Sequence, residues 1–126
     1  MMNYPIKEAL KARENAYSPY SRFCVGAALL CKNGNVYTGC NIENASYSVT
    51  VCAERVAIGN AITHGDREFQ AIVICGSSDD YCFPCGICRQ TLSEFVDADF
   101  EVVMAKSEND YKVFKMGELL PQAFKL

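Results

Sequence analysis

The turn Asn33-Gly34 lies between two apolar runs and restricts the fold of this chain more than any other feature. The runs are residues 23–31 and 36–40. Asn-Gly between apolar segments is the strongest short-range signal for a β-hairpin, because both residues accept the positive φ that a tight turn requires. The chain is therefore expected to contain an antiparallel strand pair, and its sheet is not expected to be purely parallel.

Three further segments have the apolar spacing of helices, and three more are apolar runs of strand length. The expected helices are residues 6–17, ended by Ser18-Pro19; residues 51–64, capped by Thr50 and ended by Gly65; and residues 85–96, preceded by Pro84 because proline suits a helix start. The expected strands are residues 69–75, 100–105 and 111–114. Alternating helices and strands after an opening hairpin predict an α/β fold, a three-layer α/β/α sandwich with a mixed sheet of about five strands.

Length and charge limit the kind of protein this is. A chain of 126 residues with 50% hydrophobic and 21% charged residues is expected to form one domain, residues 1–126. The net charge is -3 and no block of consecutive Lys or Arg occurs, which argues against a nucleic-acid partner and favours a small molecule. The start, residues 1–8, lacks the apolar run of a signal peptide, and the longest apolar run, residues 25–31, is too short to span a membrane, so we expect a cytoplasmic protein.

Eight cysteines in a reducing compartment are expected to be thiols or metal ligands rather than disulfides. Cys85 and Cys88 stand three residues apart after Pro84, at a predicted helix start, where two thiols on one face can hold one zinc ion. The helix N-terminus favours their thiolate forms. This pair alone also fits a redox motif or half of a structural zinc site.

A third thiol and a carboxylate strengthen the metal interpretation. Cys52 begins the predicted central helix and Glu54 follows two residues later. Three protein ligands leave one zinc position open, which is typical of catalytic sites. Residues two apart on a helix diverge by about 200°, so Glu54 is better placed for proton transfer to a bound water than for chelation. Taken alone, Glu54 also fits a solvated carboxylate at a helix start.

Cys52-Ala53-Glu54 and Pro84-Cys85-x-x-Cys88 together resemble the two halves of the zinc-dependent cytidine deaminase signature. The resemblance covers nearly the whole chain and includes residues 16–21, Phe23, residues 25–27, 39–47 and 88–90. It implies a short-chain, homotetrameric enzyme of pyrimidine salvage, which converts cytidine and deoxycytidine to uridine and deoxyuridine and releases ammonia. One zinc per subunit would be held by Cys52, Cys85 and Cys88, with Glu54 carrying the protons.

The same resemblance implies the substrate contacts. Asn41 and Glu43 match residues that hold the ribose hydroxyls, Phe23 matches one that packs on the pyrimidine, and the backbone of Ala53 is implied to contact the base. Phe124 stands in a polar C-terminal tail, where an aromatic side chain is expected to pack on its own domain or on a neighbour. The resemblance favours the neighbour, since the matching phenylalanine covers the pyrimidine in an adjacent subunit.

Two residues are expected to support the metal ligands. Three thiolates and one zinc ion sum to about one negative charge, which makes a bound water less acidic. Arg55, three residues after Cys52, lies on the same side of the helix and can hydrogen-bond to thiolate sulfur. The family signature also places Gln90, after Cys88-Arg89, among the supporting residues.

Alternatives remain open at this point. In a structural zinc module a fourth thiol would close the coordination, and Cys82 is the strongest competitor because it stands three residues before Cys85. Deaminases of another aminopyrimidine nucleoside, or of single-stranded nucleic acid, share the metal signature, but the Asn41-x-Glu43 pair opposes both. His64 is expected to favour the helix dipole rather than to bind metal. The other cysteines are expected to be small buried residues, namely Cys24, Cys31, Cys40, Cys75 and, outside the module alternative, Cys82.

Overall fold

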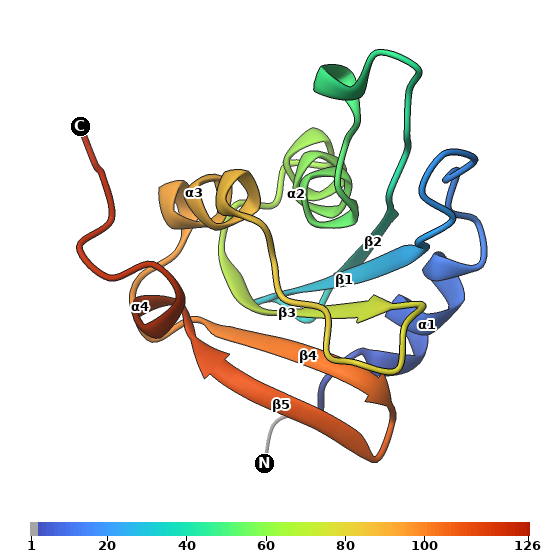
Figure 1. Cartoon of the computed structure of the whole chain (residues 1–126). Helices are drawn as coiled ribbons and strands as arrows, with labels where there is room; N and C mark the ends of the chain where they lie inside the picture. Colours follow the sequence, from blue (N-terminus) through green and yellow to red (C-terminus); the bar gives the residue numbers. More distant parts are fainter. Residues whose placement is uncertain (1–2) are drawn as a thin grey trace.

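The computed structural model describes residues 3–126, and it forms one mixed sheet of five strands (Figure 1). Residues 1–8 are the segment in which no signal peptide is expected, and the first two of them, Met1 and Met2, lie outside the described residues. The sheet order is β2-β1-β3-β4-β5, with β3 and β4 parallel and the other pairs antiparallel. The strands are β1 (Val25–Cys31), β2 (Val36–Cys40), β3 (Phe69–Gly76), β4 (Glu101–Ser107) and β5 (Asp110–Lys115). The predicted mixed five-stranded sheet is confirmed.

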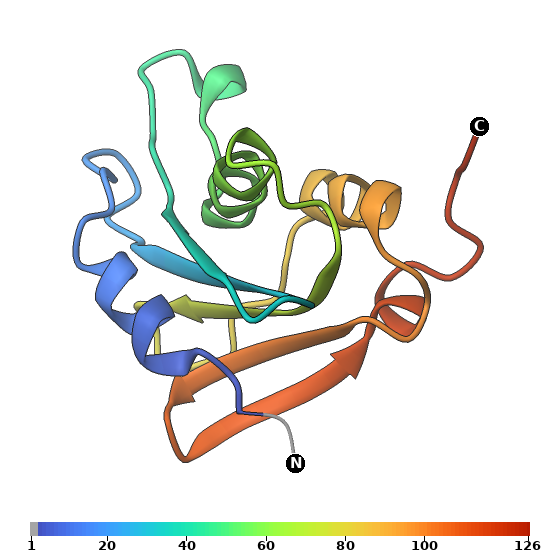
Figure 2. The same cartoon turned by 180° about the vertical axis from the view of Figure 1, so that it is seen from behind.

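Helices cover both faces of this sheet, as the predicted three-layer sandwich requires (Figures 1 and 2). Helix α1 (Ile6–Arg13) lies on one face, and α2 (Ala53–Thr63) and α3 (Gly86–Phe95) lie on the other. Two short elements were not predicted, the 3-10 helix η1 (Tyr47–Val49) and the single-turn helix α4 (Met116–Leu119). Among the helices of residues 3–126, none has the length and hydropathy that crossing a membrane requires.

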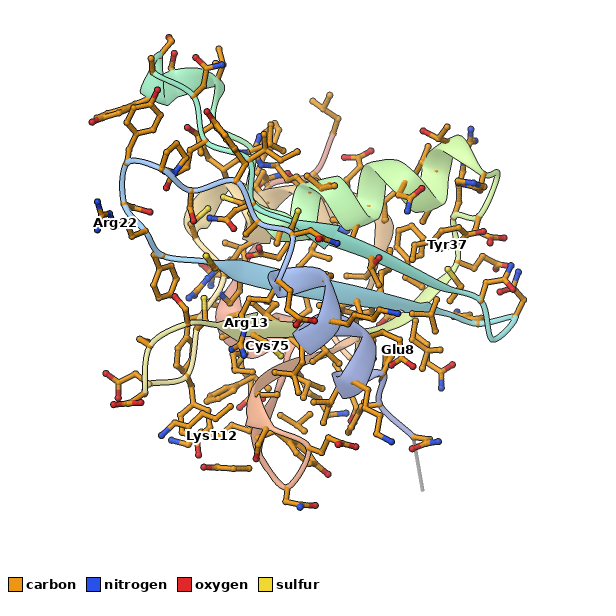
Figure 3. All side chains as sticks on the ribbon, turned by 90° about the vertical axis from the view of Figure 1, so that its right-hand side faces the viewer. Glu8, Arg13, Arg22, Tyr37, Cys75 and Lys112 are labelled. Atoms are coloured by element: carbon orange, nitrogen blue, oxygen red, sulfur yellow. The ribbon has the colours of Figure 1, made fainter. Side chains whose placement is uncertain are left out.

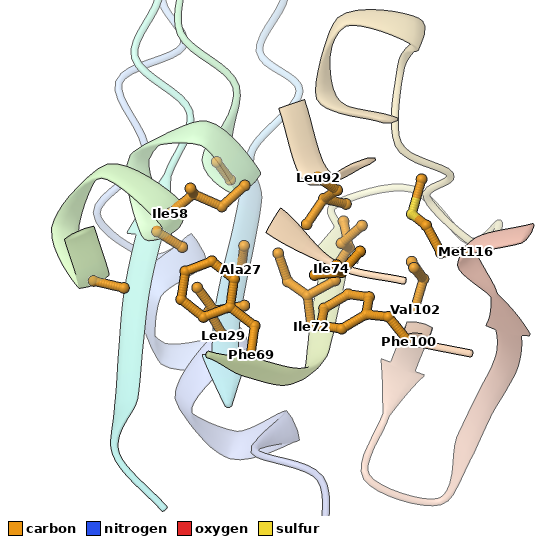
Figure 4. Packing of buried hydrophobic residues seen from close by; sticks show 14 of the residues in the cluster. Ala27, Leu29, Ile58, Phe69, Ile72, Ile74, Leu92, Phe100, Val102 and Met116 are labelled. Atoms are coloured by element: carbon orange, nitrogen blue, oxygen red, sulfur yellow. The ribbon is translucent and has the colours of Figure 1, made fainter. Parts of the chain in front are cut away.

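Two hydrophobic clusters hold the layers together. The larger lies between the sheet and helices α2 and α3, where Leu29, Ile72, Ile74 and Leu92 are fully buried (Figure 4). The smaller joins α1 to the opposite face, through residues such as Ala9. Burying a Leu or Ile side chain contributes about 1.5–3 kcal/mol, so the larger cluster is the main support of the helices that carry the cysteine motifs.

The β1–β2 hairpin forms where Asn33-Gly34 predicts it. Gly34 takes a φ of +93°, which L side chains rarely adopt. Asp66, just after α2, accepts hydrogen bonds from the Asn33 and Asn35 amides and from the Tyr37 hydroxyl. These bonds lower the pKa of Asp66 and tie the hairpin to the end of α2.

A glycine in β2 lets helix α2 approach the sheet closely. A Cβ on Gly39 would lie only 2.5 Å from the carbonyl oxygen of Ala53 and from the backbone nitrogen of Ala57. Only a residue without a side chain fits there. The first turn of α2 is therefore held directly against the sheet.

Helix α1 is shorter than the expected residues 6–17. It ends at Arg13, and the backbone of Tyr17 is extended instead. The Tyr17 N–H donates to the carbonyl of Asn41, and the Glu43 N–H donates to the carbonyl of Tyr17. Pairing with the segment after β2 therefore replaces the last predicted turn. The Arg13 side chain extends from the end of α1 to β3, where its Nη1 donates to the carbonyl of Gly76 at 2.6 Å (Figure 3).

The predicted N-cap of the central helix was wrong. Helix α2 has Cys52 as its N-cap, not Thr50, because the backbone of Val51 pairs with Ile42 and so stays extended. Thr50 instead accepts a hydrogen bond from the N–H of Asn44 through Oγ1. Pro84 precedes α3 as predicted, directly before its N-cap Cys85.

Candidate metal centre and active site

The N-termini of α2 and α3 bring three cysteines together, as the sequence spacing predicts. Cys52 and Cys85 are the N-caps of these helices, and Cys88 lies in the first turn of α3. The three Sγ atoms all lie within 4.8 Å of one another, with 3.8 Å between Cys52 and Cys85 and 3.6 Å between Cys85 and Cys88. Neither N-cap cysteine caps its own helix with a side-chain hydrogen bond to the backbone. The sulfurs are therefore available as metal ligands.

Charges around the cluster favour the deprotonated form of Cys52. Its pKa is lowered to about 5, chiefly by a hydrogen bond from the Cys88 thiol and further by the Arg55 guanidinium, although burial opposes the shift. The shared proton stays on Cys88, whose pKa is raised accordingly. Two helix N-termini add positive potential at the same point. This environment favours the thiolate form of Cys52, the form in which a cysteine binds zinc.

Arg55 lies beside the thiols, as predicted for a compensating cation. Its Nη2 donates to the carbonyl of Thr50 at 3.1 Å and lies 3.9 Å from the Cys52 sulfur. Its Nε is buried and has no hydrogen-bond partner among the described residues. The guanidinium is thus held by the backbone next to the sulfur cluster.

Glu54 is buried next to the thiols rather than solvated. Only 4% of its surface is exposed, so the alternative of a solvent-facing carboxylate at the helix start was wrong. Burial raises its pKa to about 7, and the negative charge of Cys52 acts in the same direction. A carboxyl group that gains and loses a proton near neutral pH is suited to acid-base catalysis.

The donor set fits a zinc ion with an open position. Three thiol sulfurs at two helix starts match the ligand type and number of catalytic zinc sites. Cys82 is not a member of the sulfur cluster, and burial raises its pKa to about 12, so it stays a thiol. Cys85 is exposed, so the cluster is open to solvent on one side.

The other cysteines and His64 are not members of this cluster. All eight cysteines are free; Cys31 and Cys75 are buried as predicted, whereas Cys24, Cys40 and Cys82 are only half-buried. His64 is the C-cap of α2, and its Nδ1 lies 2.8 Å from the carbonyl oxygen of Asn60. This is the helix-end position that the sequence predicts.

Asn41 organises the strand entry next to Phe23. The residue is 8% exposed; its Nδ2 donates to the carbonyl of Phe23 at 2.8 Å, and its Oδ1 accepts from the N–H of Val25 at 2.9 Å. One N–H and one acceptor site of the amide remain free for another partner. Phe23 itself is half-buried, close to Gly76 and Cys82.

Glu43 is bound to a loop that sequence reasoning did not connect with it. Its Oε1 accepts from the N–H groups of Tyr20 and Ser21, and its Oε2 accepts from the Ser21 hydroxyl. These bonds hold the pKa of Glu43 below its ordinary value, with the Ser21 hydroxyl as the main cause. A carboxylate accepts about four hydrogen bonds, so about one acceptor position stays available. Glu43 also lines a cavity of about 370 Å³ with Tyr47 and Thr50.

The C-terminal tail leaves Phe124 exposed. The residue is 68% exposed, so packing on its own domain was the wrong alternative for Phe124. Gln90 is exposed on α3, and its Nε2 donates to the carbonyl of Phe124 at 3.3 Å. Ala53, the first residue of α2, is fully buried.

Sequence reasoning missed the role of Arg89. Its side chain donates to the carbonyls of Pro84 and Leu119, although the sequence offered only its position next to Cys88 as a signal.

The fold and the site together define the class of protein. A mixed sheet covered by helices, with three thiols and a buried carboxyl at two helix starts, defines a zinc-dependent hydrolytic enzyme of the α/β/α class. The profile of the cytidine and deoxycytidylate deaminase zinc-binding region matches residues 2–106. The chain belongs to this family.

Individual relatives agree with the family match. A cytidine deaminase of Halalkalibacterium halodurans is 50% identical over 119 residues, which cover 94% of this chain and 90% of the relative. The crystal structure of cytidine deaminase from Burkholderia pseudomallei is 47% identical, with a TM-score of 0.89 over 94% of this chain and 95% of that one. A blasticidin-S deaminase of Bacillus cereus is more distant, at 36% identity over 77% of this chain and 74% of the relative.

Proposed function

We propose that this chain catalyses the hydrolytic deamination of cytidine and deoxycytidine, in the salvage of pyrimidines. The products are uridine or deoxyuridine and ammonia. The observation that carries the proposal is the group of three thiol sulfurs within 4.8 Å at two helix starts, with the buried carboxyl of Glu54 next to it. Family membership and the names of the relatives support the substrate class.

Cys52, Cys85 and Cys88 would hold one zinc ion per subunit. When bound, zinc acts as a Lewis acid that lowers the pKa of water at its open position. Glu54 takes one proton from the water that attacks C4 of the pyrimidine and delivers it to N3. It then takes the remaining proton of the added hydroxyl group and delivers it to the amine, which leaves as ammonia while C4 becomes a carbonyl. A buried carboxyl with a raised pKa suits both transfers. Arg55 offsets the charge of the thiolates.

The substrate would lie between the metal centre and the Asn41–Glu43 segment. The free acceptor of Glu43 and the free N–H of Asn41 would bind ribose hydroxyls, and a nucleoside without those hydroxyls would leave buried polar groups unpaired. Phe23 would pack on the pyrimidine ring, which Asn41 supports by holding the Phe23 carbonyl. The backbone of Ala53, at the positive end of α2, would contact the base.

The decisive test is conversion of cytidine to uridine by the purified protein. The reaction is monitored through the decrease in absorbance of the cytosine ring. We expect turnover with one zinc per chain, loss of activity with a chelator, and recovery on adding zinc. Turnover that is insensitive to zinc removal would contradict the proposed centre. Faster turnover of an aminopyrimidine nucleoside antibiotic than of cytidine would favour the alternative substrate.

A structural zinc module remains the alternative from another class. It requires a fourth protein ligand, and Cys82 lies outside the sulfur cluster. Counting sulfur ligands by X-ray absorption separates the two functions: three sulfurs and one light atom support the enzyme, and four sulfurs support the module.

We further propose a cytoplasmic homotetramer built from one domain per chain, residues 1–126. Eight free thiols are consistent with a reducing compartment. Phe124, 68% exposed, would cover the pyrimidine in an adjacent subunit. Deleting residues 122–126 should then raise the KM for cytidine and leave the zinc content unchanged. Light scattering provides the companion measurement, and a fully active monomer at nanomolar concentration would refute shared sites.

A further inference from the structure

Helix α3 connects two parts of the molecule that the proposed reaction uses separately. Its N-terminus carries Cys85 and Cys88, and its side contacts the segment that leads to Phe124. The Nζ of Lys125 also donates to the carbonyl of Ser93, near the end of the helix. Two of the three proposed metal ligands, Cys85 and Cys88, and the C-terminal tail are therefore attached to the same helix.

Arg89 is the residue of α3 that contacts both parts. Its Nε donates to the carbonyl of Pro84 at 2.8 Å, and its Nη1 donates to the carbonyl of Leu119 at 2.8 Å. The Arg89 backbone N–H donates to the carbonyl of Cys85 at 3.0 Å. One residue thus holds the carbonyls of two successive residues, Pro84 and Cys85.

These bonds restrict how Cys85 can be oriented. The Pro84 carbonyl belongs to the peptide group that joins Pro84 to Cys85, so its direction sets the plane from which the Cys85 side chain projects. Pro84 is buried, and its carbonyl lies before the helix and has no intrahelical donor. Without Arg89 that buried acceptor would need another donor, and the peptide plane would lose a fixed direction.

The second bond restricts the start of the tail. Leu119 is the last residue of α4, and its carbonyl is one that a helix leaves without an internal partner. The planar guanidinium holds its donors in a fixed fork, so the position of one carbonyl is coupled to that of the other. A lysine ammonium has no such fork.

We propose that Arg89 is a positioning residue that couples the geometry of the Cys85 ligand to the direction of the C-terminal tail. Zinc binding at one end of α3 and the placement of residues 116–121 at the other then support each other. The inference rests on the proposed zinc site and on the proposed role of Phe124. It adds that a subunit with correctly bound zinc presents its tail correctly to the neighbouring active site.

The first experiment replaces Arg89 with lysine, which keeps the charge and removes the fork. Zinc affinity is measured by competition with a chromophoric chelator, and the cobalt-substituted protein reports sulfur coordination through its charge-transfer absorption. We expect the dissociation constant for zinc to rise about 10–100-fold, as for other partners of metal ligands, together with a changed cobalt spectrum. A zinc affinity within twofold of the parent and an identical cobalt spectrum would overturn the inference.

The matched control is Lys125→Ala, which removes a bond of the tail to α3 and leaves both bonds of Arg89 in place. We expect its zinc affinity to stay within twofold of the parent. A loss as large as that of Arg89→Lys would show that any loosening of the tail weakens the metal site, and would overturn the specific role of Arg89.

A second experiment uses the unaltered chain, so it does not depend on a variant that folds. Coupling is reciprocal, so if the bond from Arg89 to the Leu119 carbonyl supports zinc binding, removing zinc should loosen residues 116–121. Hydrogen exchange of residues 116–121 should accelerate roughly fivefold or more in the zinc-free protein, and zinc should reverse it. Unchanged exchange there, or equal acceleration in β5, would refute the coupling. If the unaltered protein neither binds zinc nor deaminates cytidine, the proposed function itself fails. If the unaltered protein does both and the Arg89→Lys variant binds zinc equally well, only the inference about Arg89 fails.

Discussion

Replacing Gly39 with alanine should damage catalysis without touching the metal ligands. The added Cβ would lie 2.5 Å from the Ala53 carbonyl oxygen and from the Ala57 nitrogen, whereas ordinary contact begins at 3.4 Å. Both atoms belong to the backbone of α2, so the helix must move away by about 0.9 Å. Overpacking of this kind costs about 1–3 kcal/mol of unfolding free energy. At roughly 4 °C for each kcal/mol in a domain of this size, the Tm should fall by about 4–12 °C.

Activity should fall more steeply than stability. The displaced turn begins at Ala53, directly after the N-cap Cys52, and carries Glu54. The carboxyl and the Cys52 sulfur therefore move relative to Cys85 and Cys88, which belong to another helix. A shift of about 1 Å in a reacting group lowers the rate by about 10²-fold. We therefore expect kcat/KM for cytidine to fall by about that factor while one zinc per chain remains, measured at fixed protein and zinc concentrations.

Gly59→Ala is the matched control, because this glycine lies in the same helix and a Cβ there meets nothing within 4 Å. Alanine is about 1 kcal/mol better than glycine in a helix interior, so this variant should be slightly more stable and fully active. A Gly39→Ala variant with the Tm and kcat/KM of the parent would show that α2 is not held by close contact at Gly39.

Three further predictions concern individual side chains. Glu54→Gln should keep fold and zinc but lose at least 10²–10⁴-fold in kcat, because the amide cannot carry protons; turnover within about tenfold of the parent would rule out the proton role. Arg55→Ala should retain zinc with lower activity, since the thiolate charge would be uncompensated; an unchanged kcat and pH–rate profile would count against compensation. Because Glu43 has a lowered pKa, its contribution to binding is complete above its ordinary pKa and is lost only as pH falls through the lowered value. Ser21→Ala should move the acid rise in KM for cytidine to higher pH, and an equal midpoint in both proteins would contradict this.

The sequence by itself determined the hairpin, the α/β class and the three cysteines that come together in the candidate metal centre. These features depend on local chemistry: Asn33-Gly34 accepts a tight turn wherever it stands, and the spacing of Cys85 and Cys88 places two thiols on one helix turn. The pairing of Cys52 with them could be predicted because each thiol stands at the start of a predicted helix. The proposed proton role of Glu54 followed from its angle around the helix relative to Cys52.

Only the tertiary structure decided where the helices begin and what supports the site. Thr50 is a good capping residue by its chemistry, but the pairing of Val51 with Ile42 keeps the chain extended until Cys52, and no local pattern reveals that pairing. The bonds of Ser21 to Glu43 and of Arg89 to Leu119 join residues 22 and 30 positions apart. Such contacts depend on how the layers pack, because a backbone carbonyl looks the same in any sequence until the fold places a donor beside it.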